Sequence, residues 1–285
     1  MSGDPVKIVL DTDIGSDVDD LLALALLFGS PECDLHAVAT VYGDTVLRAR
    51  MVRRAYRLAG RPVPPIAAGA RQAHSGRPVW WAGHEGALMP DLAAEPVDET
   101  LDATALVRAG RAVAAIGPLT NVAEAVAGPH HIEQLIVMGG DFASGKPEHN
   151  IQCDVAAAQA VFDAEVPALV TGIDQTERIV LDEDSIAAVR ASGPLGELLA
   201  AEIHQFREWL GRPDSPHDAI AVLAAIRPEL FTVVPGRIRV DSDGVTTLER
   251  RDDGPHRVVV DLDVPAVLRE VVDRVCRAGV TEPRR

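Results

Sequence analysis

Residues 7–28 read KIVLDTDIGSDVDDLLALALLF, and this stretch decides the fold that we predict for the chain. A mostly apolar run, residues 7–10, ends at Asp11 and predicts a buried strand. A loop with five carboxylates follows, and the apolar residues 21–28 then predict a buried helix. Strand, polar loop and helix in this order are typical of the start of a βαβ unit, which favours a parallel sheet.

The same alternation continues along the chain. Further strands are predicted at residues 37–42, 112–116, 135–138, 168–171 and 257–262, and helices at residues 45–59, 121–127, 155–164 and 218–226. We therefore predict an α/β fold with an open, mostly parallel sheet, a Rossmann-like core and helices on both faces, formed by a single domain over residues 1–285. Residues 238–261 alternate around Ser242-Asp243-Gly244, which predicts a peripheral hairpin.

Composition and charge restrict the classes of function. The chain is 47% hydrophobic and 25% charged, which is ordinary for a globular protein. No run approaches the ~20 apolar residues of a membrane span, so we expect no membrane partner. The N-terminus lacks a secretory pattern and the three distant cysteines suggest reduced thiols, so we expect a cytoplasmic protein. A net charge of −16 disfavours nucleic acid as a partner, and we interpret the arginine-rich residues 48–57 as a solvated helix face.

The acidic loop, residues 11–20, carries the strongest chemical signal. Aspartate caps helices well, and capping explains one or two of the five carboxylates. It does not explain five together, because like charges at short range raise one another's pKa and destabilise the fold. A bound cation removes that penalty, and carboxylate oxygens select hard cations such as calcium or magnesium.

Three further motifs follow predicted strands or precede predicted helices. They are the Gly-Pro-Leu-Thr-Asn turn at residues 117–121, Glu148-His149-Asn150 in a loop, and His217-Asp218 at a helix start. Helix capping or a solvated loop explains each motif taken alone. Parallel strands end at one edge of a sheet, where ligands of such folds bind, so we expect the polar groups to meet there.

The Pro- and Gly-rich residues 75–96 predict a long surface loop that could act as a lid. Trp80 and Trp81 lie in this loop and Trp209 lies further along the chain. Each tryptophan could stack on a planar ligand or pack in the core, and the sequence leaves both interpretations open.

In this order, the motifs resemble the inosine-uridine-preferring nucleoside hydrolase family, from about residue 6 to about residue 275. The resemblance implies calcium-dependent hydrolysis of the N-glycosidic bond of a ribonucleoside, giving ribose and a free nucleobase. It also implies a place in purine or pyrimidine salvage and a homodimer or homotetramer. By position, the resemblance assigns the calcium ligands to Asp13, Asp20, Asp218 and the carbonyl of Thr120. It assigns Asp13 as the catalytic base and His217 as the catalytic acid. The residues that it assigns to the ribose are Asp19, Glu148 and Asn150.

Several positions depart from the family pattern. The acidic loop is longer by two residues, Asp17 and Val18, so either Asp17 or Asp19 could face the ribose. Asp44 stands where the family usually has asparagine, and His149 stands where it has an aromatic residue. The remaining candidates for substrate contact are His84, which resembles a family histidine, and Asp141, which could replace a family asparagine.

Two other functions stay open at this point. A haloacid-dehalogenase-like phosphatase also places Asp-x-Asp after its first strand, but it needs a lysine in mid-chain, and Lys146 is the only lysine after Lys7. A nucleoside- or sugar-binding protein of the same fold that has lost turnover would explain the altered Asp44 and His149. A dinucleotide-binding domain is disfavoured because no GxGxxG motif follows the first strand.

Overall fold

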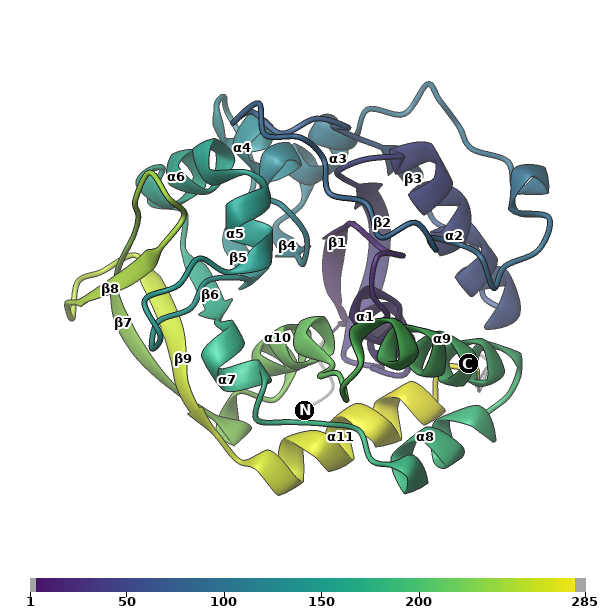
Figure 1. Cartoon of the computed structure of the whole chain (residues 1–285). Helices are drawn as coiled ribbons and strands as arrows, with labels where there is room; N and C mark the ends of the chain where they lie inside the picture. Colours follow the sequence, from purple (N-terminus) through teal and green to yellow (C-terminus); the bar gives the residue numbers. More distant parts are fainter. Residues whose placement is uncertain (1–3, 280–285) are drawn as a thin grey trace.

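The computed structural model describes residues 4–279, and one nine-stranded sheet organises them (Figure 1). The strand order is β3-β2-β1-β4-β5-β6-β9-β7-β8. The strands are β1 (Val6–Thr12), β2 (Cys33–Thr40), β3 (Ile66–Ala68), β4 (Ala112–Ala115), β5 (Gln134–Met138), β6 (Ala168–Thr171), β7 (Phe231–Val240), β8 (Thr246–Arg250) and β9 (His256–Leu262). Pairing is parallel from β3 through to β9 and antiparallel where β7 joins β9 and β8. This confirms the predicted α/β fold with a mostly parallel sheet.

Helices cover both faces of this sheet (Figure 1). The longer ones are α1 (Asp19–Phe28), α2 (Thr45–Leu58), α3 (Ala103–Ala109), α4 (Thr120–Val126), α6 (Val155–Asp163), α8 (Glu183–Arg190), α9 (Pro194–Leu210), α10 (His217–Ile226) and α11 (Val264–Cys276). The short ones are α5 (His149–Cys153), α7 (Ile173–Thr176) and the 3-10 turns η1 (Leu92–Ala94) and η2 (Pro228–Leu230).

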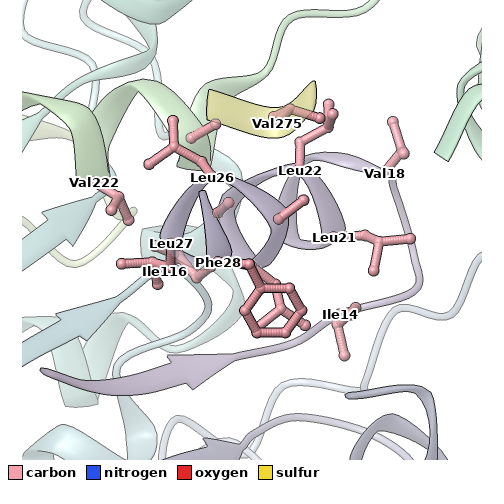
Figure 2. Close-up of a cluster of buried hydrophobic side chains, with 14 of the residues drawn as sticks. Ile14, Val18, Leu21, Leu22, Leu26, Leu27, Phe28, Ile116, Val222 and Val275 are labelled. Carbon is pink, nitrogen blue, oxygen red and sulfur yellow. The ribbon is translucent and has the colours of Figure 1, made fainter. Parts of the chain in front are cut away.

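The alternation of side chains along each strand produces two apolar layers. In β1, Ile8 and Leu10 belong to the layer that contains α1, α10 and α11, whereas Val9 points to the layer that contains α3, α4 and α6. Every residue of α1 is buried, as expected for a helix that is apolar all round. Figure 2 shows α1 packed against Val222 of α10 and Val275 of α11.

The strand order places a topological switch point beside β1. The chain leaves β1 towards β2 and β3, and it then returns to the other side of β1 as β4. Loops after the strands on either side of such a point diverge and leave a crevice at the carboxyl ends. The acidic loop follows β1 and the Gly117 turn follows β4, so the fold brings both motifs to this crevice.

The hairpin prediction was correct in its pairing and in its peripheral position. β7 and β8 pair as an antiparallel hairpin through residues 241–245. The pair forms one end of the main sheet, since β7 also pairs with β9, which lies beside β6. Only β8 lies at the edge.

Candidate active site

A cavity of about 580 Å³ opens at the carboxyl edge of the sheet. Its walls come from the acidic loop, α5, the start of α10, the long loop 75–96 and the end of α9. Most of the motifs picked out from the sequence therefore meet in one place. The lining residues among them are Asp13, Asp17, Asp19, Asp20, Glu148, His149, Asn150, His217 and Asp218.

The acidic loop turns its carboxylates inward. Ligand oxygens of Asp17, Asp19 and Asp20 all lie within 4.8 Å of one another. Thr12 at the end of β1 donates its hydroxyl to Asp20 and so fixes that side chain. Two oxygens on one calcium ion, each at 2.3–2.6 Å, are separated by no more than about 5 Å. The spacing and the all-oxygen donor set therefore fit a hard divalent cation.

Asp13 and Asp218 bring two further carboxylates from distant parts of the chain. The Asp13 carboxylate lies so close to Gly117 that a Cβ there would collide with it. Burial, followed by the charges of Asp20 and Asp17, raises the pKa of Asp218 well above its ordinary value. Burial also raises the pKa of Asp20, and the charge of Asp13 adds to that effect. These carboxylates are close enough to destabilise one another, as the sequence predicted.

A buried arginine compensates part of this charge, and it corrects one interpretation of the sequence. Residues 48–57 are not simply a solvated face, because Arg48 is 0% exposed. Its guanidinium donates to the carbonyls of Tyr42 and Ile14 at 2.7 Å and to the Ser16 hydroxyl at 3.2 Å, and it lies 4.9 Å from the Trp81 ring. Arg48 therefore ties the acidic loop to its neighbours.

Glu148 and Asn150 are held rigidly at the start of α5. The Glu148 carboxylate caps the helix by accepting from the backbone N–H groups of Asn150 and Ile151, and it also accepts from Gly140 at 3.0 Å. The Asn150 amide donates to the carbonyl of Ile116 at 3.0 Å. Both side chains still line the cavity, so their remaining polar atoms are available to a ligand in a fixed geometry.

His217 and Asp218 begin α10 on another wall. The Nδ1 atom of His217 lies 2.6 Å from the Thr176 hydroxyl, and its Nε2 lies 3.9 Å from Asp214. Burial lowers the pKa of His217 to about 4. The ring is thus oriented by Thr176 while its other nitrogen faces towards Asp214.

Four predicted residues do not line the cavity. Asp44 caps α2 and pairs with Arg71 at 3.0 Å. Asp141 accepts hydrogen bonds from the backbone N–H groups of Ala143 and Ser144. Both carboxylates therefore serve local structure, and this geometry does not support the predicted contact with substrate. The Nε2 atom of His84 lies 3.0 Å from the Ser16 carbonyl, and its ring packs edge-on against Phe206 and Trp209, two lining residues. Thr120 donates its hydroxyl to Asp154 at 2.8 Å, and its carbonyl as a metal ligand stays a prediction.

The structure also shows lining residues beyond the predicted ones, and it places the three tryptophans that the sequence had singled out. Phe206 and Trp209 stack in parallel at 5.6 Å, and Trp80 meets Trp209 edge-on at 5.9 Å. Trp80 and Trp209 are 40% and 50% exposed at the cavity mouth, whereas Trp81 packs over Arg48. The other such lining residues include Tyr42, Arg77, Cys153, Arg212 and Asp214. The spacing of Phe206 and Trp209, three residues apart on one helix, was the available signal.

No helix within residues 4–279 is both long enough and apolar enough to cross a membrane. Cys33, Cys153 and Cys276, all within that range, are free thiols.

Comparison with known proteins agrees with this geometry. The family described as inosine-uridine preferring nucleoside hydrolase matches residues 8–269. A probable uridine nucleosidase 2 of Arabidopsis thaliana is 28% identical over 96% of this chain and 98% of its own length. A non-specific ribonucleoside hydrolase of Escherichia coli is 30% identical over 85% of this chain and 86% of its own length.

Solved structures give the same result for the fold. A purine-preferring ribonucleoside hydrolase from Gardnerella vaginalis superposes with a TM-score of 0.83 at 24% identity, covering 96% of this chain and all (100%) of the other. A plant nucleoside hydrolase superposes with a TM-score of 0.82 at 25% identity, covering 95% of this chain and 99% of the other. The family match removes the haloacid-dehalogenase alternative. This chain belongs to the inosine-uridine-preferring nucleoside hydrolase family and is a hydrolase acting on N-glycosyl compounds.

Proposed function

We propose that this protein hydrolyses the N-glycosidic bond of ribonucleosides with the help of a resident calcium ion, releasing ribose and a free nucleobase. The convergence of Asp13, Asp20 and Asp218 in one cavity carries the proposal. These three carboxylates come from the loop after β1, the first turn of α1 and the start of α10. All three line one cavity, and burial together with the charges of Asp20 and Asp13 raises the pKa of Asp218, so a shared cation would relieve a repulsion that costs stability.

The ion would be held by Asp13, Asp20, Asp218 and the carbonyl of Thr120. Bound there, calcium would supply positive charge that acidifies a water molecule and anchors ribose hydroxyls. Asp17, one of the two residues by which the acidic loop exceeds the family pattern, has an oxygen close to those of Asp19 and Asp20. We therefore assign Asp17 to support of the ion or the sugar. Magnesium fits less well, since it prefers strict octahedral geometry and keeps several waters.

The chain's own residues account for the remaining chemistry. Asp13 accepts a proton from the attacking water, and its pKa is raised by burial to about 6, near neutral pH, as suits a general base. Glu148, Asn150 and Asp19 hold the ribose hydroxyls. We assign proton donation to the departing base to His217. Because burial lowers its pKa to about 4, we expect this donation to strengthen as the pH falls towards that value.

Electrostatics favours bond cleavage in this cavity. As the base departs, positive charge spreads over the ribosyl C1′–O4′ unit, and the surrounding carboxylates stabilise it. The proposal needs no covalent nucleophile, so water displaces the base in one step with inversion at C1′. Bases of either class fit, since the named relatives include a uridine nucleosidase and a non-specific ribonucleoside hydrolase.

One assay tests this proposal. Purified protein with calcium is incubated with a panel of purine and pyrimidine nucleosides, and reducing sugar is measured with and without a chelator. Release of ribose that stops on chelation supports the proposal. Calorimetric binding of a ribose analogue without release of base from any nucleoside would instead show a binding protein that has lost turnover.

We further propose a homodimer or homotetramer that acts in nucleoside salvage in the cytoplasm. Membership of the family supports this proposal. Light scattering coupled to size-exclusion chromatography tests the assembly, and a monomer across the micromolar range would reject it.

A further inference from the structure

His149 is the residue at which this cavity departs most clearly from the family pattern. It lies between Glu148 and Asn150, whose side chains are fixed by backbone hydrogen bonds, so the direction of the intervening residue is fixed too. The His149 side chain lines the cavity and is exposed to it. Its ring meets Trp80 edge-on, with 5.1 Å between the ring centroids.

The two ring nitrogens of His149 have different surroundings. Nε2 lies 3.5 Å from the sulfur of Cys153, one helical turn further along α5. Within residues 4–279, Nδ1 has no hydrogen-bond partner from the protein, and it is not enclosed by other atoms. One nitrogen therefore orients the ring, and the other is free to meet a ligand.

The charges around His149 favour the imidazolium form. Burial opposes that form, but the sulfur of Cys153 and the charges of Glu148 and Asp13 outweigh burial and raise the pKa of His149. Both ring nitrogens then carry hydrogen at neutral pH, so Nδ1 is a donor.

The position of His149 along the cavity matches the departing base. The ribose is assigned to Glu148 and Asn150 on either side of it, and the aromatic surface that suits a planar base begins at Trp80, which its ring contacts. His149 thus stands between the sugar end and the base end of the cavity.

We propose that His149 is a catalytic residue, additional to His217, that donates a hydrogen bond from Nδ1 to the base as it departs. This inference rests on the proposed function. The C1′–N bond breaks and its electron pair passes to the base, while the hydroxyl of water bonds to C1′. Asp13 takes one proton from that water and His217 gives one to the base, and the proton on Asp13 restores His217 afterwards. His149 therefore keeps its own proton and only stabilises the negative charge that develops.

The test compares leaving groups that need this stabilisation with one that does not. His149→Phe keeps a ring beside Trp80 but removes the donor. For uridine and inosine we expect kcat/KM to fall about 100-fold, the usual effect of removing one preorganised donor. For p-nitrophenyl riboside, whose leaving group departs readily as an anion, we expect a loss below about fivefold.

Two further variants make the result specific. His149→Gln keeps a neutral donor, and we expect an intermediate loss of about tenfold on uridine. His74→Phe is the matched control, because His74 pairs with Glu124 outside the cavity lining, and we expect its activity on all substrates to stay within about twofold of the wild type.

The outcomes separate the inference from the proposed function. Equal losses on nucleosides and on p-nitrophenyl riboside would give His149 a role in folding or sugar binding and overturn the inference. Unchanged activity on uridine and inosine would overturn it as well. A wild-type chain that cleaves none of the three substrates would reject the proposed function itself, and the inference would fall with it.

Discussion

Glu202 gives a quantitative test of the electrostatics that is independent of the cavity. It lies on α9 with 7% of its surface exposed, and its Oε1 is buried without a partner in the described part of the chain. Burial raises the pKa of Glu202 from its ordinary value of 4.5 to about 7. Because the folded protein binds this proton more tightly than the unfolded chain, Glu202 is tolerated when neutral and destabilises the fold when ionised.

The size and sign of the effect follow from that difference. A pKa raised from 4.5 to about 7 corresponds to about 3 kcal/mol of unfolding free energy. The wild type has its full stability below pH 4.5 and loses this amount as the pH rises through 7. Glu202→Gln removes the ionisation at little change in volume, so we expect the variant to match the wild type at pH 4.5 and to exceed it by about 3 kcal/mol at pH 8.

Urea unfolding across this pH range measures the difference, since other groups titrate equally in both proteins and cancel. Glu197→Gln, on the exposed face of the same helix, is the matched control and should leave the unfolding free energy within about 0.5 kcal/mol at every pH. A difference between Glu202→Gln and the wild type that does not change with pH would refute the reasoning.

Four shorter predictions concern the site. Asp13→Ala should lower kcat by about 1,000-fold or more with the melting temperature retained, and near-normal kcat would reject its role as the base. Calcium at 100 times its Kd should raise the unfolding free energy by about 2.7 kcal/mol, measured by thermal unfolding with and without chelator, and an absent shift would argue against the ion. Arg48→Met should cost about 3 kcal/mol in urea unfolding, because it leaves two carbonyls and the acidic loop uncompensated. His217→Ala should slow uridine more than p-nitrophenyl riboside, and equal losses would argue against proton donation.

The sheet could be predicted because its strands are short apolar runs in a regular alternation. Residues 135–138 and 168–171 match β5 and β6 within one residue. The attachment of the hairpin to the main sheet could not be predicted, because local alternation specifies pairing between β7 and β8 but not that β7 also joins β9. Helices α9 and α11 carry many charged residues, and no motif led to them, although α9 supplies part of the cavity wall.

The site could be predicted as far as the topology fixes it. Residues that follow parallel strands meet at one edge of the sheet, and Asp13 after β1 and Glu148 after β5 do so. Asp218 follows α9 instead, and strand order alone does not place it there. Whether a polar side chain enters the cavity or caps a helix depends on local backbone geometry that the sequence does not reveal. Asp44 and Asp141 illustrate this limit, since both resemble site residues in position and both bond to nearby backbone N–H groups.

The acidic loop and Arg48 together explain why this cavity suits its chemistry. Two arginines, Arg77 and Arg212, line it together with seven carboxylates, those of Asp13, Asp17, Asp19, Asp20, Glu148, Asp214 and Asp218. The proposed divalent ion, three arginines (Arg48, Arg77 and Arg212) and a protonated His149 would supply six positive charges, so the seven carboxylates would stay in excess when ionised. A neutral nucleoside gains little from that excess, but the ribosyl group gains much as it becomes cationic. In the proposed mechanism, the carboxylates whose repulsion costs folding stability are therefore the groups that would lower the barrier, and Arg48 holds their loop in place.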